Sequence, residues 1–309
     1  MPGSDDTAVI DLPGTYTVTL NDDDATVAGF TLNNADATFS ASAQSLTING
    51  PASFTAGVVS WTNSILTGSG SLLNDVTVSV LGNCSFSINS IVNNGTISLP
   101  GVHSLGVTGS GTTLTNLGSI TLGSGSSLLV DCATFVNASK GVITNSGNSF
   151  AVRNNGTFQF DGGTLPPGSP AIYLQEANLI FGAGATGGGL IRAGGMNTLS
   201  GDIPSGITVQ IGPGTVNNGN LVASGSLINS GVVALTSTFA NAPIALTVSS
   251  GTLTNGTLGE INLNTGAAGG GARVIAAEFE NVRELNVTSN SARLEKASVN
   301  HVNSGVINI

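Results

Sequence analysis

The residues best suited to chemistry in this 309-residue chain are two separated acid–base pairs. Arg153 and Asp161 are close enough in sequence to share one face of a strand array, and so are Arg192 and Asp202. A carboxylate beside a basic group can move a proton during polysaccharide cleavage. Neither pair forms a recognisable motif, so we expect no catalytic residues and keep a polysaccharide-acting enzyme as an alternative.

The acidic segment Asp22–Asp24 raises the question of a metal site. Hard cations such as Ca²⁺ favour clustered carboxylate oxygens in a turn. The segment lacks the alternating acids and the glycine of an EF-hand loop. We therefore expect a solvated acidic turn and no metal.

Histidine and cysteine are too sparse to suggest a catalytic triad or a zinc site. His103 and His301 are isolated from each other and from both cysteines, so we expect them in turns or at the surface. Cys84 and Cys132 lie 48 residues apart, which is about two coils of roughly 24 residues. A disulfide requires their Cα atoms to lie within about 7 Å. We favour two buried free thiols and keep the disulfide open.

The segment Gly182–Gly187 formally matches a glycine-rich dinucleotide-binding loop. It follows the apolar run Leu179–Phe181, but Gly188–Arg192 comes next and has no helical pattern. A pyrophosphate would have no helix N-terminus to bind. We interpret the segment as a turn and expect no cofactor.

The threonine and serine residues suggest a binding surface rather than a catalytic site. Alternating or paired hydroxyls occur at Thr15–Thr19, Thr113–Thr115, Thr236–Thr238 and Thr252–Thr254. Stacked coils would place such hydroxyls about 4.8 Å apart, and a flat array of this kind can bind ice or a crystalline glycan. The irregular spacing of these groups favours ordinary β-propensity on a solvated face, with the binding surface as an alternative.

A repeated corner of Asn and Gly indicates how the chain positions these residues. Asn and Gly tolerate the positive φ of a tight bend, and a β-forming residue follows each corner. Because the corners recur without intervening helices, they predict a chain wound into a solenoid. Clear corners occur at residues 94–97, 116–120, 155–158, 218–221, 255–258 and 303–307.

Short alternating strands connect the corners. The segment Thr15–Leu20 predicts Tyr16, Val18 and Leu20 on the core face. Corners at 93–95, 116–118 and 137–141 recur every 21 to 23 residues. The sequence therefore predicts an all-β fold, a right-handed parallel β-helix that is a single-stranded β-solenoid with three strands per coil.

Two later segments are harder to interpret. Val274–Leu294 also fits helical spacing, but Val287 and Thr288 favour another coil. The proline-rich segment 165–170 lacks ladder donors, which predicts a loop or a sub-boundary there. We expect residues 1–11 to form an N-terminal tail or a remnant of an expression vector, and residues 12–309 to form the solenoid.

Composition supports a folded and acidic solenoid. The chain is 40% hydrophobic and 8% charged, with 44 glycines and a mean hydropathy of +0.30, which excludes disorder. Residues 1–139 carry nine acids and no Lys or Arg, a net charge of −9, whereas residues 140–309 carry −1. Nucleic acid and anionic membrane surfaces bind clustered Lys and Arg, so we expect neither as a partner.

The sequence gives no strong indication of membrane insertion or of glycosylation. No apolar run approaches the roughly 18 residues that span a bilayer, so no membrane insertion is expected. Glycosylation sequons are weak evidence because corner chemistry alone produces them. They begin at Asn94, Asn137, Asn155, Asn255 and Asn286.

A family resemblance rests on the segment Ser60–Asn74. Trp61, the run Leu66-Thr67-Gly68-Ser69-Gly70 and the closing Asn74 stand among Asn-x-Gly corners. This segment resembles the repetitive β-helix ectodomains of bacterial surface adhesins, of the filamentous-haemagglutinin type and of autotransporter passengers. The resemblance covers most of residues 12–309. It implies secretion, surface display and a structural or adhesive role, and it transfers no ligand-binding residues.

We therefore predict an extracellular, non-catalytic structural or adhesive module of a larger bacterial surface protein. The alternatives are a polysaccharide-acting enzyme with a pectin-lyase-like fold and an ice- or glycan-binding surface. Expected partners are carbohydrate or a host or cell surface. Because Val306–Ile309 begins a strand that nothing covers, we also expect end-to-end self-association.

Overall fold

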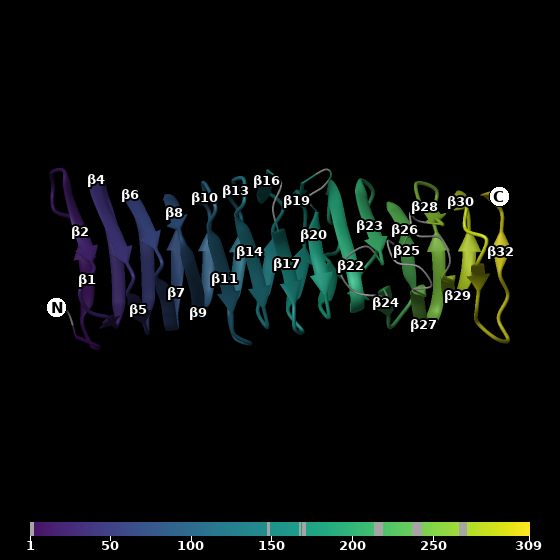
Figure 1. Ribbon diagram of the computed structural model, residues 1–309, viewed down its shortest axis with the longest axis horizontal. Coiled ribbons are helices and arrows are strands. Elements are labelled where there is room, and N and C mark those ends of the chain that lie inside the picture. Colours follow the sequence, from purple (N-terminus) through teal and green to yellow (C-terminus); the bar gives the residue numbers. More distant parts are fainter. Residues whose placement is uncertain are drawn as a thin grey trace. The chain divides into compact units, whose positions relative to one another are not determined.

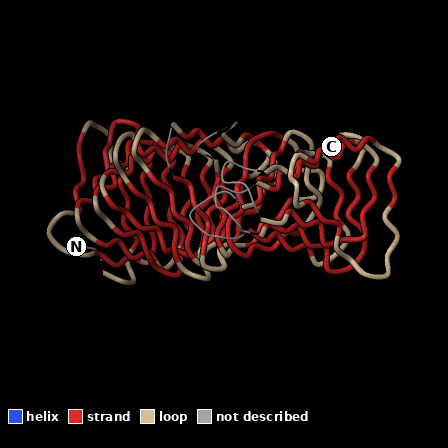
Figure 2. Tube along the Cα trace, turned by 45° about the vertical axis from the view of Figure 1, so that its right-hand side comes forward, coloured by secondary structure: helices blue, strands red, loops and turns tan. Residues whose placement is uncertain are grey.

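The computed structural model describes residues 3–146, 149–166, 168, 171–212, 219–236, 243–265 and 271–309. These residues form strands and turns, and no helix occurs among them (Figure 2). Parallel strands stack as a β-solenoid of about 13 turns, which confirms the predicted all-β parallel β-helix. The chain divides into two compact units, unit 1 (Met1–Ala151) and unit 2 (Val152–Ile309).

Unit 1 winds through three parallel ladders, and the chain moves from one ladder to the next at each corner (Figure 1). Its strands are β1 (Thr7–Ile10), β2 (Tyr16–Leu20), β3 (Ala25–Val27), β4 (Gly29–Ser42), β5 (Ser45–Ile48), β6 (Pro51–Thr62), β7 (Ile65–Asn74), β8 (Thr77–Leu81), β9 (Asn83–Asn93), β10 (Thr96–Leu99), β11 (Ser104–Thr108), β12 (Thr113–Asn116), β13 (Ser119–Leu122), β14 (Ser127–Asp131), β15 (Thr134–Asn137) and β16 (Val142–Asn145), with β17 (Ser149–Arg153) at the boundary.

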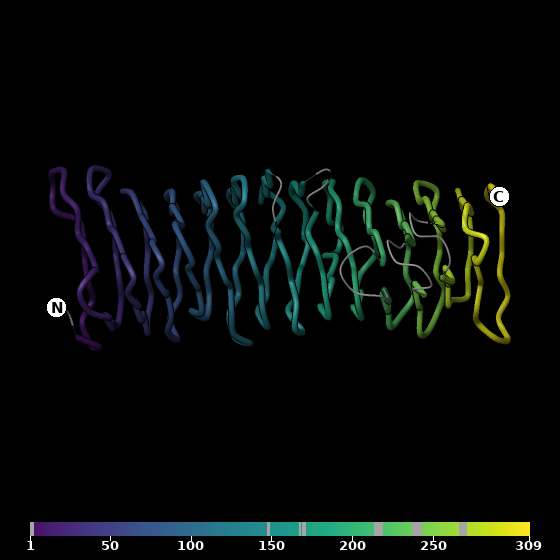
Figure 3. Tube along the Cα trace, in the orientation of Figure 1, coloured from purple at the N-terminus to yellow at the C-terminus, as the bar shows by residue number. Residues whose placement is uncertain are grey.

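The three ladders of unit 1 are distinguished by their strands. The first joins β1, β12, β15 and parts of β4, β6, β7 and β9. The second joins β2, the later halves of β4 and β6, and then β8, β10, β13 and β16. The third joins β3, β5, β11, β14 and the first parts of β7 and β9. Residues one coil apart in sequence therefore lie side by side, as the gradual colour change in Figure 3 shows.

Unit 2 repeats the same parallel arrangement. Its strands are β18 (Thr157–Phe160), β19 (Gly163–Thr164), β20 (Ile172–Gln175), β21 (Asn178–Phe181), β22 (Gly187–Ser200), β23 (Ile207–Ile211), β24 (Gly219–Ala223), β25 (Leu227–Asn229), β26 (Val232–Leu235), β27 (Ile244–Asn255), β28 (Glu260–Leu263), β29 (Arg273–Asn281), β30 (Glu284–Val287), β31 (Ala292–Leu294), β32 (Val302–Asn303) and β33 (Val306–Asn308).

Alternation along each strand builds the core. In β13, Ile120 and Leu122 are fully buried while Ser119 and Thr121 face outward. Apolar side chains from successive coils stack, and aromatic rings do the same. Trp61 lies between Phe39 and Phe86 with ring centroids 5.8 and 6.1 Å away. Each coil therefore buries its apolar side chains against the coils before and after it.

Several details differ from the sequence-based expectations. Residues 7–10 form strand β1, paired with β4, inside the segment assigned to a tail. Val18 lies on the core face as predicted, in the column of the buried Phe39, but it is 36% exposed because β2 pairs on one side only among the described residues. The Val274–Leu294 segment forms β30, β31 and most of β29, so the predicted coil is confirmed over the helix. Part of the proline-rich segment, residues 167 and 169–170, lies outside the described residues.

Candidate functional site

The acid–base pairs singled out in the sequence do not come together. Asp202 accepts a hydrogen bond from the Ile228 backbone at 2.8 Å, while the Arg192 side chain donates to Gln210 at 3.1 Å. Both contacts bridge neighbouring coils. Asp161 accepts hydrogen bonds from the side chain of Gln159, two residues earlier, at 2.9 and 3.0 Å. The side chains of Arg192 and Asp202 therefore connect neighbouring coils instead of bonding to each other.

The candidate metal and cofactor segments are turns. Asp24 accepts a hydrogen bond from the Ser45 backbone at 2.7 Å, and Asp22 and Asp23 are exposed. Within the described part of the chain, no group of three His, Cys, Asp or Glu residues is placed to hold a metal. Gly182–Gly187 is a turn that leads into strand β22, as the sequence predicted.

The cysteines and histidines occupy structural positions. Cys84 and Cys132 form no disulfide with each other. Cys84 is buried and Cys132 is exposed, so the prediction of two buried thiols is right for Cys84 and wrong for Cys132. Cys132 ends up in a turn, with a positive φ of 55°. Burial raises the pKa of the Cys84 thiol, whose Sγ lies 3.3 Å from the Trp61 carbonyl. His103 lies at a turn and accepts a hydrogen bond from the Gly82 backbone through Nδ1 at 2.8 Å, and His301 is exposed.

The corner asparagines form ladders that the sequence did not reveal, and all of their members except the last, Asn303, are buried. In unit 1 the Nδ2 group of each donates to Oδ1 of the asparagine one coil later, at 2.7, 2.9 and 3.0 Å. We call these residues the first asparagine ladder: Asn74, Asn93, Asn116 and Asn137. Unit 2 holds a second asparagine ladder with distances of 2.9, 2.8 and 2.7 Å: Asn229, Asn255, Asn281 and Asn303.

Several ladder asparagines also fasten the corner of the next coil. The Nδ2 group of Asn93 donates to the Ser119 carbonyl at 3.1 Å, and that of Asn255 donates to the Glu284 carbonyl at 2.8 Å. These asparagines end strands in an extended conformation and have no positive φ. The positive φ predicted for corner asparagines is confirmed at Asn155, with φ of 62°, and is wrong for the ladder. The sequons at Asn137 and Asn255 lie in the buried ladders, so neither amide is available for glycosylation.

Arg273 is a second buried polar feature that sequence reasoning missed. Its guanidinium is fully buried and donates to the carbonyls of Asn264, Thr265 and Gly271 at 2.7, 2.6 and 2.6 Å. Burial lowers the pKa of this group. Three carbonyl acceptors compensate for the water that the buried cation has lost. Arg273 thereby connects the segments that precede and follow residues 266–270.

The second ladder of unit 1 carries an outward column of hydroxyls with one Ser or Thr in each of seven successive coils. The register places every member beside the next. Neighbours in such a column lie about 4.8 Å apart. The members are Thr19, Ser40, Ser60, Ser79, Ser98, Thr121 and Thr144.

A second column runs beside the first, two residues earlier in each strand and hence about 6.6 Å away. Five of its seven positions are again Ser or Thr: Thr17, Thr38, Val58, Thr77, Thr96, Ser119 and Val142. We call the two columns together the hydroxyl face. The side-chain hydroxyls of the face have no hydrogen-bond partner among the described residues, and none of the fourteen side chains is charged or aromatic.

Several hydroxyls on the third ladder of unit 1 form hydrogen bonds within the protein. On the third ladder, Ser85 and Thr108 lie 3.4 Å apart and Ser104 donates to Asn83 at 2.7 Å. Ile65 and Leu129 interrupt that face. The second ladder is therefore the surface with the most regular unpartnered hydroxyls.

Only part of the predicted threonine array lies on the hydroxyl face. Thr17 and Thr19 belong to it, whereas Thr113 and Thr115 lie on the first ladder. Thr254 of unit 2 donates to Glu280 at 3.4 Å, and residues 237–238 lie outside the described residues. The sequence contains another pattern that marks the hydroxyl face more directly than the threonine groups do. An apolar–Ser/Thr–apolar triplet, such as Val78-Ser79-Val80 or Ile97-Ser98-Leu99, recurs every 19 to 23 residues along most of unit 1.

Comparison with known proteins identifies no relative of this chain. No protein-family model, curated protein or solved structure matches the chain. Among the described residues no helix is long and apolar enough to cross a membrane.

Proposed function

We propose that the chain is a non-catalytic binding module that adheres through the hydroxyl face of unit 1 to a solid polysaccharide. In keeping with the adhesin resemblance, we place it outside the cell as a module of a larger bacterial surface protein. The observation that carries the proposal is the alignment of hydroxyls over seven consecutive coils without partners inside the described protein.

The face matches a lattice better than a single soluble molecule. A β-solenoid repeats its side chains at about 4.8 Å between coils and about 6.6 Å along a strand. The backbone ladder fixes both spacings, so ordering the hydroxyls costs little entropy when a periodic ligand binds. A lattice that presents oxygens in rows can accept and donate hydrogen bonds at many of these positions together.

Charge favours an uncharged ligand. The two columns carry no charge, and unit 1 has a strongly acidic composition that repels polyanions. Both candidate ligands, a solid polysaccharide and ice, present an uncharged array of hydroxyl or water oxygens. Because the columns contain no aromatic ring to pack on sugar C–H groups, ice is the second candidate.

Co-sedimentation with microcrystalline cellulose and with chitin, together with an ice-shaping assay, tests the proposal. We expect retention on at least one polysaccharide, with little loss at high salt because no charges take part. Thr121→Tyr should weaken retention by about tenfold, roughly 1.4 kcal/mol, because the ring holds the lattice away from neighbouring hydroxyls. Thr115→Tyr is the matched control, since Thr115 is equally half-buried but lies on the first ladder.

The outcomes separate the candidates. Ice shaping that Thr121→Tyr abolishes, without polysaccharide retention, keeps the face and changes its ligand to ice. The absence of both activities, or equal losses in Thr121→Tyr and Thr115→Tyr, overturns the hydroxyl face as the binding site. Release of soluble sugars that disappears in Asp202→Asn would instead support the enzyme alternative.

A further inference from the structure

The turns of unit 2 form a surface depression of about 360 Å³, which we call the turn pocket. It lies where the chain leaves strands β21, β22 and β25, and it is lined by residues 181–185, residues 201–204 and Ser230. Small-molecule sites typically have volumes of about 300–1,000 Å³. The turn pocket is therefore large enough for a single small ligand or for one unit of a longer one.

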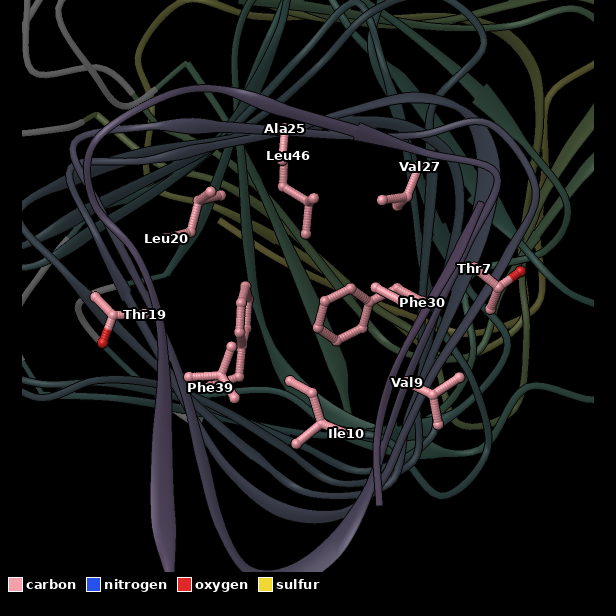
Figure 4. A pocket seen from close by; sticks show the side chains of 12 residues that line it. Thr7, Val9, Ile10, Thr19, Leu20, Ala25, Val27, Phe30, Phe39 and Leu46 are labelled. Carbon is pink, nitrogen blue, oxygen red and sulfur yellow. The ribbon is translucent and has the colours of Figure 1, made fainter. Parts of the chain in front are cut away.

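The turn pocket differs in character from the interior of the solenoid. In the first coils of unit 1, Phe30 and Leu46 point into a space lined mainly by apolar side chains of the core (Figure 4). The turn pocket instead combines two buried apolar side chains, Phe181 and Ile203, with the exposed carboxylate of Asp202. An apolar surface beside a few polar groups is typical of a site that binds a small ligand in one orientation.

The carboxylate of Asp202 is held in place on one side and open on the other. Its Oδ1 accepts a hydrogen bond from the Ile228 backbone at 2.8 Å. Its Oδ2 forms no hydrogen bond with any residue that the structure describes. An ionised carboxylate accepts hydrogen bonds through both oxygens. Asp202 can therefore bind a ligand through Oδ2 while Oδ1 stays fixed to the next coil.

A second carboxylate lies beside the pocket. The Oδ1 atom of Asp161 lies where a Cβ of the lining residue Gly182 would project. The neutral amide of Gln159 donates to both oxygens of Asp161 and leaves its negative charge in place. No Lys, Arg or His is among the residues that line the pocket. Two carboxylates without a lining base favour a cationic ligand.

The glycine turn of the pocket leaves its backbone accessible. The turn is closed by a hydrogen bond from the Ala185 backbone to the Gly182 carbonyl at 3.1 Å. Gly184 has a φ of 73°, and a Cβ there would meet no atom within 4 Å. A ring can therefore approach this turn more closely than it could approach residues with side chains. A pyranose ring suits such a site because it has an apolar C–H face and a polar edge.

We propose that the turn pocket binds one amino-sugar ring of a glycan. The protonated amine pairs with Asp202 Oδ2, and the C–H face of the ring lies on the apolar side of the pocket. A charge-assisted hydrogen bond of this kind is stronger than one between neutral groups. The site belongs to unit 2 and does not depend on the hydroxyl face of unit 1.

Isothermal titration calorimetry of the full chain with two sugar tetramers tests the inference. One is the glucosamine tetramer, and the other is the N-acetylglucosamine tetramer of the same length. We expect the glucosamine tetramer to bind about tenfold more tightly or better, because acetylation removes the positive charge of the amine. Added salt should weaken this binding, and so should a pH high enough to deprotonate the sugar amine.

Two variants locate the binding in the turn pocket. Asp202→Asn keeps a side-chain oxygen that can accept the Ile228 hydrogen bond but removes the charge, so it should bind the glucosamine tetramer about tenfold more weakly. Glu176→Gln is the matched control, because Glu176 is an exposed acid of unit 2 that does not line the pocket. Thr121→Tyr on the hydroxyl face should bind the tetramer like the wild type. Circular dichroism confirms that each variant keeps its strands.

Several outcomes overturn the inference. They are the absence of glucosamine tetramer binding, equal affinity for the two tetramers, and equal losses in Asp202→Asn and Glu176→Gln. A loss confined to Thr121→Tyr would place the binding on the hydroxyl face instead. Trilysine that binds as tightly as the glucosamine tetramer would show that the pocket recognises any amine rather than an amino sugar. The comparison of the two tetramers uses the wild type, so it tests charge recognition independently of the variants.

Discussion

At the scale of single residues, the asparagine ladders decide how the corners are held. Asn93 and Asn116 are fully buried, yet each amide donates to two acceptors on the next coil, the side chain of the following ladder asparagine and a corner carbonyl. A buried amide without such partners would be strongly unfavourable. Every asparagine in a ladder donates to the asparagine of the next coil. Replacing one of them therefore leaves a donor without its acceptor in the preceding coil and an acceptor without its donor in the following coil.

We predict that Asn116→Ala destabilises unit 1 by roughly 2–5 kcal/mol. The change removes the acceptor of Asn93 Nδ2 and the donor to Asn137 Oδ1, both in a buried environment. The shift of the urea unfolding transition, followed by circular dichroism, measures the effect.

The neighbouring Asn94 provides the control for this experiment. Its side chain is exposed and donates to Asp75 at 2.8 Å on the surface. Asn94→Ala should therefore cost less than about 1 kcal/mol. Equal shifts for the two alanine variants would contradict a special role for the ladder.

At the scale of elements, the corner glycine lets consecutive coils approach closely. A Cβ at Gly118 would overlap the carbonyl oxygen of Gly95 in the coil before it, although Gly118 has no positive φ. Gly118→Ala should therefore destabilise unit 1 by about 1–3 kcal/mol through steric overlap. Its effect is measured by the same urea transition.

A glycine within a strand serves as the comparison. The nearest atom to a Cβ at Gly106 would be Thr108 Cγ2 at 3.5 Å, an ordinary contact. Gly106→Ala should be neutral or slightly stabilising, since alanine restricts the unfolded chain. If Gly106→Ala is as harmful as Gly118→Ala, close approach at the corner is not the cause.

The elements were predictable from sequence to the extent that they depend on local pattern. Alternation within Thr15–Leu20 predicted strand β2, and Val287-Thr288 correctly favoured strand over helix. The asparagine ladder was not predictable in the same way, because pairing Asn93 with Asn116 depends on the register between coils. The same register turns the scattered Ser98 and Thr121 into one column. Local propensity alone does not contain that information.

At the scale of the whole molecule, stability is expected to be local. In a repeat protein each coil contacts its neighbours, so stability is approximately a sum of coil terms and nearest-neighbour interfaces. The two compact units each possess their own ladders and their own buried asparagines. Damage to one coil should therefore weaken the adjacent coils more than distant ones.

Hydrogen exchange of the full-length Asn116→Ala variant tests this expectation. We predict faster exchange in β9, β12 and β15, which carry Asn93, Asn116 and Asn137, because these strands lose ladder contacts directly. Exchange in β26 and β28 of unit 2 should match the wild type, since opening free energies differ from region to region. Val58→Thr, an exposed change on the hydroxyl face, serves as the control and should leave exchange unchanged throughout. A uniform acceleration over both units in Asn116→Ala would mean that the chain opens as one cooperative body, which contradicts nearest-neighbour stability.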